Sequence, residues 1–311
     1  MSKKAFIFPG QGSQYAGMGK DLAGSFKVAA ETFEEADNAL GFGLSRLCFE
    51  GPEEDLKLTT NTQPAILTTS VAALRVLQAE TGISADYLAG HSLGEYSALV
   101  ASGAMVFADA VRTVRSRGAF MQEAVPVGVG AMAAILGAEP SQIAEICAEA
   151  AQGEVLSPAN FNSPGQIVIA GHASAVNRAI DIAKAKGLRK VMLLPVSAPF
   201  HCALMVPAGE RLRETLDNVP ISALQAPVVT NVEARPNNDS ARVKPLLVDQ
   251  VSAPVRWDES VREMVRLGVT EFCEIGPGKV LSGLVKRIDK EVKIFSLEDA
   301  AGLAALKEVL K

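Results

Sequence analysis

The pentapeptide Gly90-His91-Ser92-Leu93-Gly94 has the G-x-S-x-G spacing. In this pattern the serine lies on a sharp turn between a strand and a helix, with its hydroxyl exposed. The glycines allow that turn without steric conflict, and N–H groups at the helix start stabilise a developing oxyanion. Tyr87-Leu88-Ala89 is strand-like, and a helix is expected through about Val100. The pattern predicts a nucleophile at Ser92, with an ordinary strand–helix turn as the alternative.

A serine nucleophile needs a base, and the chain has three histidines. His91 adjoins Ser92, so we expect its side chain to point elsewhere, as a wall or core residue. His172 follows a strand and is expected to be solvated. His201 lies where the chain returns from a small domain to a large one, so it is able to face an interdomain cleft; an ordinary loop histidine is the alternative. No acid between Ser92 and His201 stands out, so a backbone carbonyl or an amide would hold the imidazole.

The helix expected from about Ala108 to Ala124 carries three arginines, and only Arg117 shares its apolar face. Arg117 lies three residues after Val114 and four before Met121, spacings that place side chains on one side of a helix. An inward guanidinium needs an anion, because an unpaired buried charge is costly. Two partners fit: an internal carboxylate in a structural salt bridge, or a substrate carboxylate bound bidentately.

Gly10-Gln11-Gly12 follows a short buried strand at residues 5–8. It is not a dinucleotide motif, because G-x-G-x-x-G would need glycine or alanine at Tyr15. Residues 128–133 fit G-x-G-x-x-A, but a strand rather than a helix is expected after them. A loop after the first strand is able instead to bring a backbone N–H to the oxyanion. Gln11 is placed for that role, with a plain turn as the alternative.

Strand-like and helix-like segments alternate outside residues 126–200, which is typical of the α/β class. One long helix there is expected to be capped by Asn61, with Pro64 in its first turn, and to end at Gly82. Residues 126–200 predict the order strand, helix, strand, strand, helix, strand, which is the ferredoxin-like pattern. The expected strands are 131–136, 155–159, 166–170 and 190–195, and the expected helices are 141–151 and 173–186. We therefore expect a large domain from residues 1–125 and 201–311 and an inserted small domain from residues 126–200.

The 311 residues are 48% hydrophobic and 21% charged, with a net charge of −5, so the chain buries a core and has no affinity for nucleic acid or an anionic membrane. Its four cysteines are widely spaced, which disfavours a disulfide framework or a metal site. No apolar run is long enough for a signal peptide or a membrane span. We expect a soluble cytoplasmic protein.

A series of segments in one order resembles the malonyl-CoA:acyl carrier protein transacylase family of fatty acid synthesis. The resemblance runs nearly from end to end. The matching segments are Phe8-Pro9-Gly10-Gln11-Gly12-Ser13-Gln14, Asn61-Thr62-Gln63-Pro64-Ala65, Gly90-His91-Ser92-Leu93-Gly94-Glu95-Tyr96, Arg117-Gly118, Asn160-Phe161-Asn162-Ser163-Pro164, Phe200-His201, Gln250 before Pro254-Val255-Arg256-Trp257, and Glu274-Ile275-Gly276-Pro277-Gly278.

The resemblance implies roles at these positions. Ser92 would be the nucleophile and His201 the base. Backbone N–H groups of Gln11 and Leu93 would form the oxyanion hole. Arg117 would hold the malonyl carboxylate, and the main-chain carbonyl of Gln250 would orient His201. The implied fold is an α/β-hydrolase-like core with the ferredoxin-like insert, and Phe200 before the histidine points to malonyl rather than methylmalonyl.

The implied reaction moves malonyl from malonyl-CoA to the phosphopantetheine thiol of acyl carrier protein, through an ester on Ser92 in a ping-pong cycle. The coenzyme A thioester is then a substrate, with no permanently bound cofactor and no metal. The alternatives are a discrete acyltransferase serving a polyketide synthase, a thioesterase, and a scaffold that only binds carrier protein. For carrier docking, the basic side chains of Lys184, Lys186, Arg189 and Lys190 are candidates, with a solvated helix end as the alternative. The roles of Gln63, His91, Asn160 and Asn162 stay open.

Overall fold

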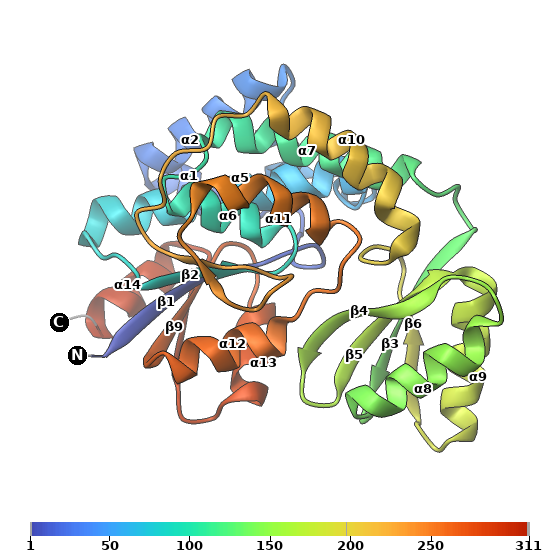
Figure 1. Cartoon of the computed structure of the whole chain (residues 1–311). Coiled ribbons are helices and arrows are strands. Elements are labelled where there is room, and N and C mark those ends of the chain that lie inside the picture. Colours follow the sequence, from blue (N-terminus) through green and yellow to red (C-terminus); the bar gives the residue numbers. More distant parts are fainter. Residues whose placement is uncertain (1, 197, 310–311) are drawn as a thin grey trace.

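The protein is described by a computed structural model for residues 2–196 and 198–309. These residues form a mixed α/β fold with two β-sheets, one larger than the other (Figure 1). The α/β class expected from the alternation of strands and helices is confirmed at this level.

The larger sheet has six strands in the order β10-β9-β1-β2-β7-β8. Strands β10, β9, β1, β2 and β7 are parallel, and β8 is antiparallel to β7. Carboxyl ends of parallel strands meet at one edge of a sheet, where α/β proteins place ligand sites. The bounds are β1 Lys3–Phe8, β2 Tyr87–Gly90, β7 Val228–Val229, β8 Pro236–Asn237, β9 Val269–Ile275 and β10 Lys293–Leu297.

Strand β1 is buried on both faces, which explains its continuous apolar run. Successive side chains of a strand point to opposite faces. Phe6 and Phe8 join the core under helices α5 and α7, whereas Ala5 and Ile7 join the core over helices α12 and α13. The larger sheet is therefore covered by helices on both sides, with α5, α6 and α7 above it and α12 and α13 below it in Figure 1.

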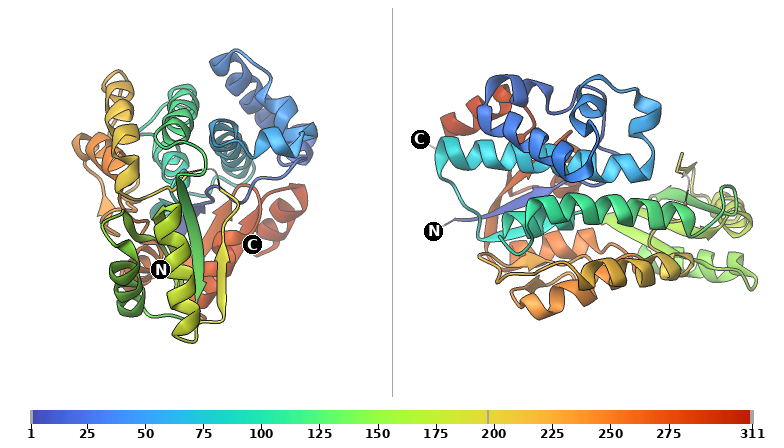
Figure 2. Two further views of the ribbon diagram at one scale, coloured as in Figure 1. Left: turned by 90° about the vertical axis from the view of Figure 1, so that its right-hand side faces the viewer. Right: turned by 90° about the horizontal axis from the view of Figure 1, so that it is seen from above.

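The helices of the larger part include three that run side by side when the molecule is seen from above, namely α5, α7 and α10 (Figure 2). Helix α7 then leads into the smaller sheet. The bounds are α1 Lys20–Ser25, α2 Lys27–Leu40, α3 Leu44–Glu50, α4 Glu53–Leu56, α5 Thr59–Thr81, α6 Gly94–Ala101, α7 Phe107–Glu123, α10 Val206–Asp217, α11 Val243–Gln250, α12 Trp257–Arg266, α13 Val280–Ile288 and α14 Ala300–Val309, with short 3₁₀ turns at Ala203–Met205 and Ser240–Arg242.

The smaller sheet is antiparallel, with strand order β4-β5-β3-β6. Alternate side chains divide between two cores. Ile135 and Ile169 pack under α8 and α9, whereas Met132 and Val168 join the core of the larger part. The bounds are β3 Gly130–Leu136, α8 Pro140–Ala151, β4 Leu156–Ser163, β5 Gln166–His172, α9 Ala173–Ala185 and β6 Lys190–Leu193.

Backbone hydrogen bonds also join the smaller sheet to the larger part. The Phe161 N–H donates to the Val255 carbonyl at 2.9 Å, and the Val255 N–H donates to the Ala159 carbonyl at 2.9 Å. Strand β4 therefore pairs with the segment before α12, and this contact lies next to the residues that surround His201.

Three local expectations are wrong. Strand β6 ends at Leu193 rather than at residue 195. Helix α5 begins at Thr59 after Leu58, so Asn61 does not cap it; the Asn61 amide donates to the Asp55 carbonyl instead, at 2.9 Å. Strand β4 extends to Ser163 rather than ending at residue 159, because it pairs with β5 over most of its length. Within the described residues, no helix is both long and apolar enough to cross a membrane.

Candidate active site

Ser92 lies between the end of β2 and the start of α6, with a φ of 51°. Residues other than glycine rarely adopt this left-handed conformation, and such strain concentrates at functional sites. The turn is possible because its glycines lack side chains: a Cβ on Gly94 would lie 2.1 Å from the Phe8 carbonyl oxygen. The result is that the Ser92 Oγ reaches His201, with 2.8 Å between Oγ and Nε2.

His201 is 4% exposed and is held by two main-chain carbonyls. Its Nδ1 lies 2.9 Å from the Gln250 oxygen and 3.2 Å from the Ala253 oxygen. Because both neighbours are acceptors, Nδ1 must carry the proton, which leaves Nε2 free to accept from the Ser92 hydroxyl. The imidazole tautomer is thus set without an acidic side chain.

The charge state of His201 follows from its surroundings. Burial, and secondarily the nearby Arg117 cation, lower the pKa of His201 to about 3. Desolvation disfavours the charged imidazolium, and a like charge disfavours it further. His201 is therefore neutral at physiological pH and able to accept a proton from Ser92.

Arg117 is 2% exposed and donates only to neutral groups. Its Nη1 lies 2.7 Å from Gln63 Oε1, and its Nη2 lies 2.9 Å from Gln250 Oε1 and 3.0 Å from Ser92 Oγ. Its Nε has no hydrogen-bond partner within the described residues. Burial lowers the pKa of Arg117, since the charged form loses solvation.

The internal salt bridge that the sequence left open for Arg117 is absent within residues 2–196 and 198–309, where none of the ion pairs includes this side chain. The buried acid Glu95 interacts with Arg117 electrostatically but does not hydrogen-bond to it. A buried guanidinium without a directly bound anion is costly, so the site favours an anion that would complete it. Helix α7 approaches α5 closely at this point: a Cβ on Gly118 would lie 2.6 Å from the Thr59 carbonyl oxygen.

Gln11 and Leu93 line the same cavity as Ser92. Within residues 2–196 and 198–309 their backbone N–H groups donate to no backbone or side-chain acceptor. By contrast, the Ser92 N–H donates to Asn231 Oδ1 at 2.6 Å, so it is not available to an oxyanion. The loop after β1 lies very close to the elbow, because a Cβ on Gly10 would lie 2.3 Å from the His91 carbonyl oxygen.

These groups surround one cavity of about 570 Å³. Its lining comes from both sheets: Met132 lies on β3 and Asn160 on β4, whereas Ser92 and Arg117 belong to the larger part. Such a cavity, with a few convergent polar groups among apolar walls, is typical of small-molecule sites. The remaining lining residues are Gln11, Gln63, His91, Leu93, Met121, Leu194, Val196, Phe200 and His201.

Comparison with known proteins places this site in a family. Residues 5–304 match the model of the acyl transferase domain. Over 309 residues the chain is 50% identical to the malonyl CoA-acyl carrier protein transacylase of Escherichia coli, covering 99% of this chain and 100% of the relative. The chain belongs to the malonyl CoA-acyl carrier protein transacylase family.

Solved structures agree with this membership. An acyl carrier protein S-malonyltransferase from Vibrio cholerae matches with a TM-score of 0.96 and 50% identity, covering 98% of this chain and 100% of that one. A malonyl-transacylase in complex with a type II polyketide synthase acyl carrier protein matches with a TM-score of 0.97 and 47% identity, covering 99% of this chain and 100% of that one.

Of the six site residues expected from the sequence, the structure brings His201 and Arg117 into contact with the Ser92 hydroxyl. The Gln250 carbonyl contacts His201, and Gln11 and Leu93 line the same cavity. Two further groups were not expected there. Asn231, two residues after β7, accepts the Ser92 N–H, and Gln63 accepts from Arg117. A buried asparagine after a parallel strand adjacent to the elbow strand was the available signal for Asn231.

The other two histidines lie elsewhere. His91 Nε2 lies 2.8 Å from Asn162 Oδ1 on β4, so His91 links the elbow to the smaller sheet as part of the cavity wall. His172 is half-buried rather than solvated, because its Nδ1 accepts the Val155 N–H at 3.0 Å.

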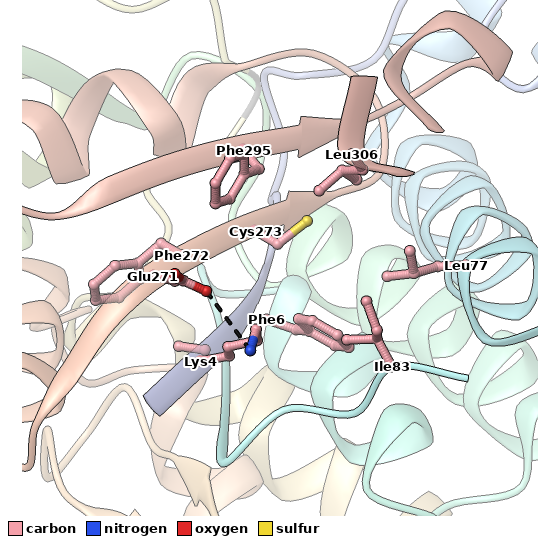
Figure 3. A pocket seen from close by; sticks show the side chains of 10 residues that line it. Lys4, Phe6, Leu77, Ile83, Glu271, Phe272, Cys273, Phe295 and Leu306 are labelled. Atoms are coloured by element: carbon pink, nitrogen blue, oxygen red, sulfur yellow. Dashed lines mark ion pairs between the residues drawn. The ribbon is translucent and has the colours of Figure 1, made fainter. Parts of the chain in front are cut away.

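A second hollow of about 330 Å³ lies away from this site, between the larger sheet and helices α5 and α14. Figure 3 shows apolar side chains around it, including Phe6, Leu77 and Phe295. Its only charged side chains, Lys4 and Glu271, pair with each other at 3.7 Å. It holds no nucleophile–base pair, so we assign the chemistry to the Ser92 cavity.

Among the described residues, no cluster of histidine, cysteine or acidic side chains is suited to a metal.

Proposed function

We propose that this chain transfers a malonyl group from malonyl-CoA to the phosphopantetheine thiol of acyl carrier protein, through an ester on Ser92. One observation carries the proposal: the Ser92 Oγ contacts both His201 Nε2 and the guanidinium of Arg117. A base and an unpaired cation at one hydroxyl suit a nucleophile that attacks an acyl group bearing a carboxylate.

In the first half of the cycle, Ser92 Oγ attacks the thioester carbonyl while His201 Nε2 takes its proton. The N–H groups of Gln11 and Leu93 stabilise the oxyanion, a contribution that typically amounts to roughly 3–4 kcal/mol per donor. The C–S bond then breaks, and the imidazolium returns its proton to the coenzyme A thiolate. Malonyl is left as an ester on Ser92.

In the second half, the phosphopantetheine thiol gives its proton to His201 and attacks the ester carbonyl. The ester C–O bond breaks, and the imidazolium reprotonates Ser92. A thioester is consumed and a thioester is formed, so the exchange needs no oxidant and no permanently bound cofactor. The main-chain carbonyl of Gln250 holds the His201 tautomer in both halves.

Substrate choice would follow from Arg117. A malonyl carboxylate supplies the counter-ion that this guanidinium lacks, and arginine binds a carboxylate through two parallel hydrogen bonds. Neutral acyl groups leave the cation unpaired. Phe200, which lines the cavity and is 8% exposed, would restrict branching next to the carboxylate.

We also propose two domains: an α/β-hydrolase-like large domain at residues 1–125 and 201–311, and a ferredoxin-like small domain at residues 126–200. The support is the β-α-β-β-α-β order of β3 to β6, the antiparallel sheet order, and a separate core under α8 and α9.

A cytoplasmic location is supported by four cysteines that are all buried and free.

A second candidate is the same transfer for a polyketide synthase, favoured by the 47% identical neighbour in complex with a carrier protein of that kind. The two differ only in the carrier protein that accepts malonyl. A thioesterase differs in chemistry, because water would attack the Ser92 ester.

The test is to incubate the purified chain with malonyl-CoA and phosphopantetheinylated carrier proteins from each pathway. We expect malonyl-carrier thioester to form faster than free malonate. Preference between the carriers identifies the pathway. Release of malonate without loading of either carrier would replace the transferase with a thioesterase.

A further inference from the structure

Glu95 is a buried acid that the transfer steps above do not use. It lies in the first turn of α6, three residues after Ser92, and is 2% exposed. Its Oε2 accepts two hydrogen bonds, from the Asn231 backbone N–H at 2.9 Å and from the Gln250 Nε2 at 2.8 Å. One carboxylate oxygen therefore joins two residues that each touch Ser92.

The first of these connections, through Asn231, fixes the backbone of the elbow. Asn231 Oδ1 accepts the Ser92 N–H at 2.6 Å, and its Nδ2 donates to the Gly90 carbonyl at 2.7 Å. Asn231 thus holds the chain at and before the strained serine. Because Glu95 accepts the Asn231 main-chain N–H, the position of the Asn231 side chain, and so of the two hydrogen bonds that it makes to the elbow, depends on Glu95.

The second connection, through Gln250, reaches the other reacting groups. The Gln250 Nε2 also donates to the Ser92 carbonyl at 3.1 Å, its Oε1 accepts from Arg117 at 2.9 Å, and its main-chain carbonyl accepts from His201 Nδ1. An amide has an oxygen end and an N–H end, and only one orientation satisfies these partners. Glu95 is an acceptor, so it requires the N–H end and thereby turns the Gln250 oxygen towards Arg117.

We propose that Glu95 is a positioning residue for the transfer, aligning Ser92, His201 and Arg117 through Asn231 and Gln250. This inference rests on the proposed function. Burying a carboxyl is costly without compensating hydrogen bonds. A residue needed only to fill space at this position would be apolar.

Two substitutions of similar size separate hydrogen bonding from packing. Glu95→Gln keeps an acceptor for both N–H groups, and Glu95→Met removes it. The measurement is the single-turnover rate of Ser92 malonylation by malonyl-CoA, per correctly folded molecule. For Glu95→Met we expect the maximal rate to fall by roughly 10²-fold, the size of effect that small misalignments produce.

The half-saturating malonyl-CoA concentration should change little in Glu95→Met, because Arg117 keeps its contact with Gln63. Glu95→Gln should lose less than about tenfold in rate, since a net hydrogen bond is worth about 1 kcal/mol. The matched control is Glu274→Met. Glu274 is also fully buried and accepts the Leu281 and Ser282 N–H groups at the start of α13, away from the cavity, so its loss should lower stability but not the malonylation rate.

A folded Glu95→Met that malonylates at the wild-type rate would overturn the inference. So would a Glu95→Gln as slow as Glu95→Met, because charge rather than hydrogen bonding would then be the cause. If Glu95→Met does not fold, Asn231→Ala tests the same hydrogen bonds to the elbow. We expect Asn231→Ala to malonylate more slowly than wild type, and the double variant with Glu95→Gln to lose little further rate. An unchanged malonylation rate in Asn231→Ala would refute the inference. If wild type itself forms no malonyl ester, the proposed function fails instead.

Discussion

Arg117 Nη2 donates to Ser92 Oγ across 3.0 Å, although no carboxylate of the described residues forms an ion pair with this arginine. The guanidinium is buried, and its other hydrogen-bond partners are the neutral amides of Gln63 and Gln250. The serine hydroxyl and a positive charge with no ion-pair partner among the described residues thus share one cavity. This arrangement links the attack on an acyl group to recognition of an anion beside it.

Replacing Arg117 should therefore change which acyl group is accepted. Loss of a buried charge partner typically costs about 2–5 kcal/mol, so Arg117→Ala should lower kcat/KM for malonyl-CoA by roughly 30- to 5,000-fold. Acetyl-CoA lacks the carboxylate and should lose much less. The measurement is the ratio of kcat/KM for the two thioesters. Arg115→Ala on the same helix is the control, because Arg115 contacts Asn61 and not the cavity; an unchanged ratio in Arg117→Ala would contradict the role.

The malonylation rate should begin to fall only at a pH far below the value at which an ordinary histidine becomes protonated. Burial and Arg117 lower the pKa of His201 to about 3, so the neutral base persists as pH falls. An imidazole with an ordinary pKa would be only about 3% neutral at pH 5. We expect kcat/KM for malonyl-CoA to stay level between about pH 7 and pH 5.

This profile is best measured in Glu95→Gln as well as wild type, because burial raises the pKa of Glu95 to about 7 and places its titration in the same window. A tenfold fall per pH unit below about 6.5 in both proteins would show that His201 titrates normally, against the expectation.

The stability of Glu95→Gln relative to wild type should increase as the pH rises. The folded-state pKa of Glu95, about 7, lies above the ordinary value of 4.5. A raised folded pKa contributes stability that is complete below the unfolded pKa and is lost as pH rises through the folded one. Glutamine carries no charge to bury, so the melting temperature of the variant, compared with wild type, should be higher at pH 8 than at pH 5. An equal difference at the two pH values would contradict the buried ionisation.

Docking of an acidic carrier protein is expected to involve the exposed basic residues near α9 and β6. Lys186 already pairs with Glu149 at 3.3 Å, so Lys184 and Lys190 are the better pair to reverse. Lys184→Glu with Lys190→Glu should raise KM for carrier protein, most at low salt, because exposed charges are screened at high salt. Malonylation of Ser92 by malonyl-CoA should not change. Reversing Lys286, on α13, and Lys290, which follows that helix, is the control, and an equal effect there would discard the surface.

The elbow and the fold class were predictable because their signals are local. The spacing around Ser92 and the alternation of strands and helices each depend on near neighbours in sequence. The β-α-β-β-α-β order was predictable for the same reason. The start of α5 was not, since Asn61 is a good capping residue by type but finds the Asp55 carbonyl instead.

The supporting hydrogen bonds were beyond sequence reasoning. Glu95 and Asn231 are 136 residues apart, and Glu95 and Gln250 are 155 apart. Each is an ordinary polar residue in its own segment. Glu95 and Asn231 meet because they follow the adjacent strands β2 and β7. Gln250 reaches them from the end of α11. Both contacts depend on long-range packing.

The central claim is the covalent ester on Ser92, and intact-protein mass spectrometry tests it most directly. Wild type and Ser92→Ala would be exposed briefly to malonyl-CoA without carrier protein. We predict a single malonyl adduct on wild type, absent from Ser92→Ala and lost when the carrier thiol is added. No adduct on wild type, or an adduct that persists in Ser92→Ala, would contradict the account.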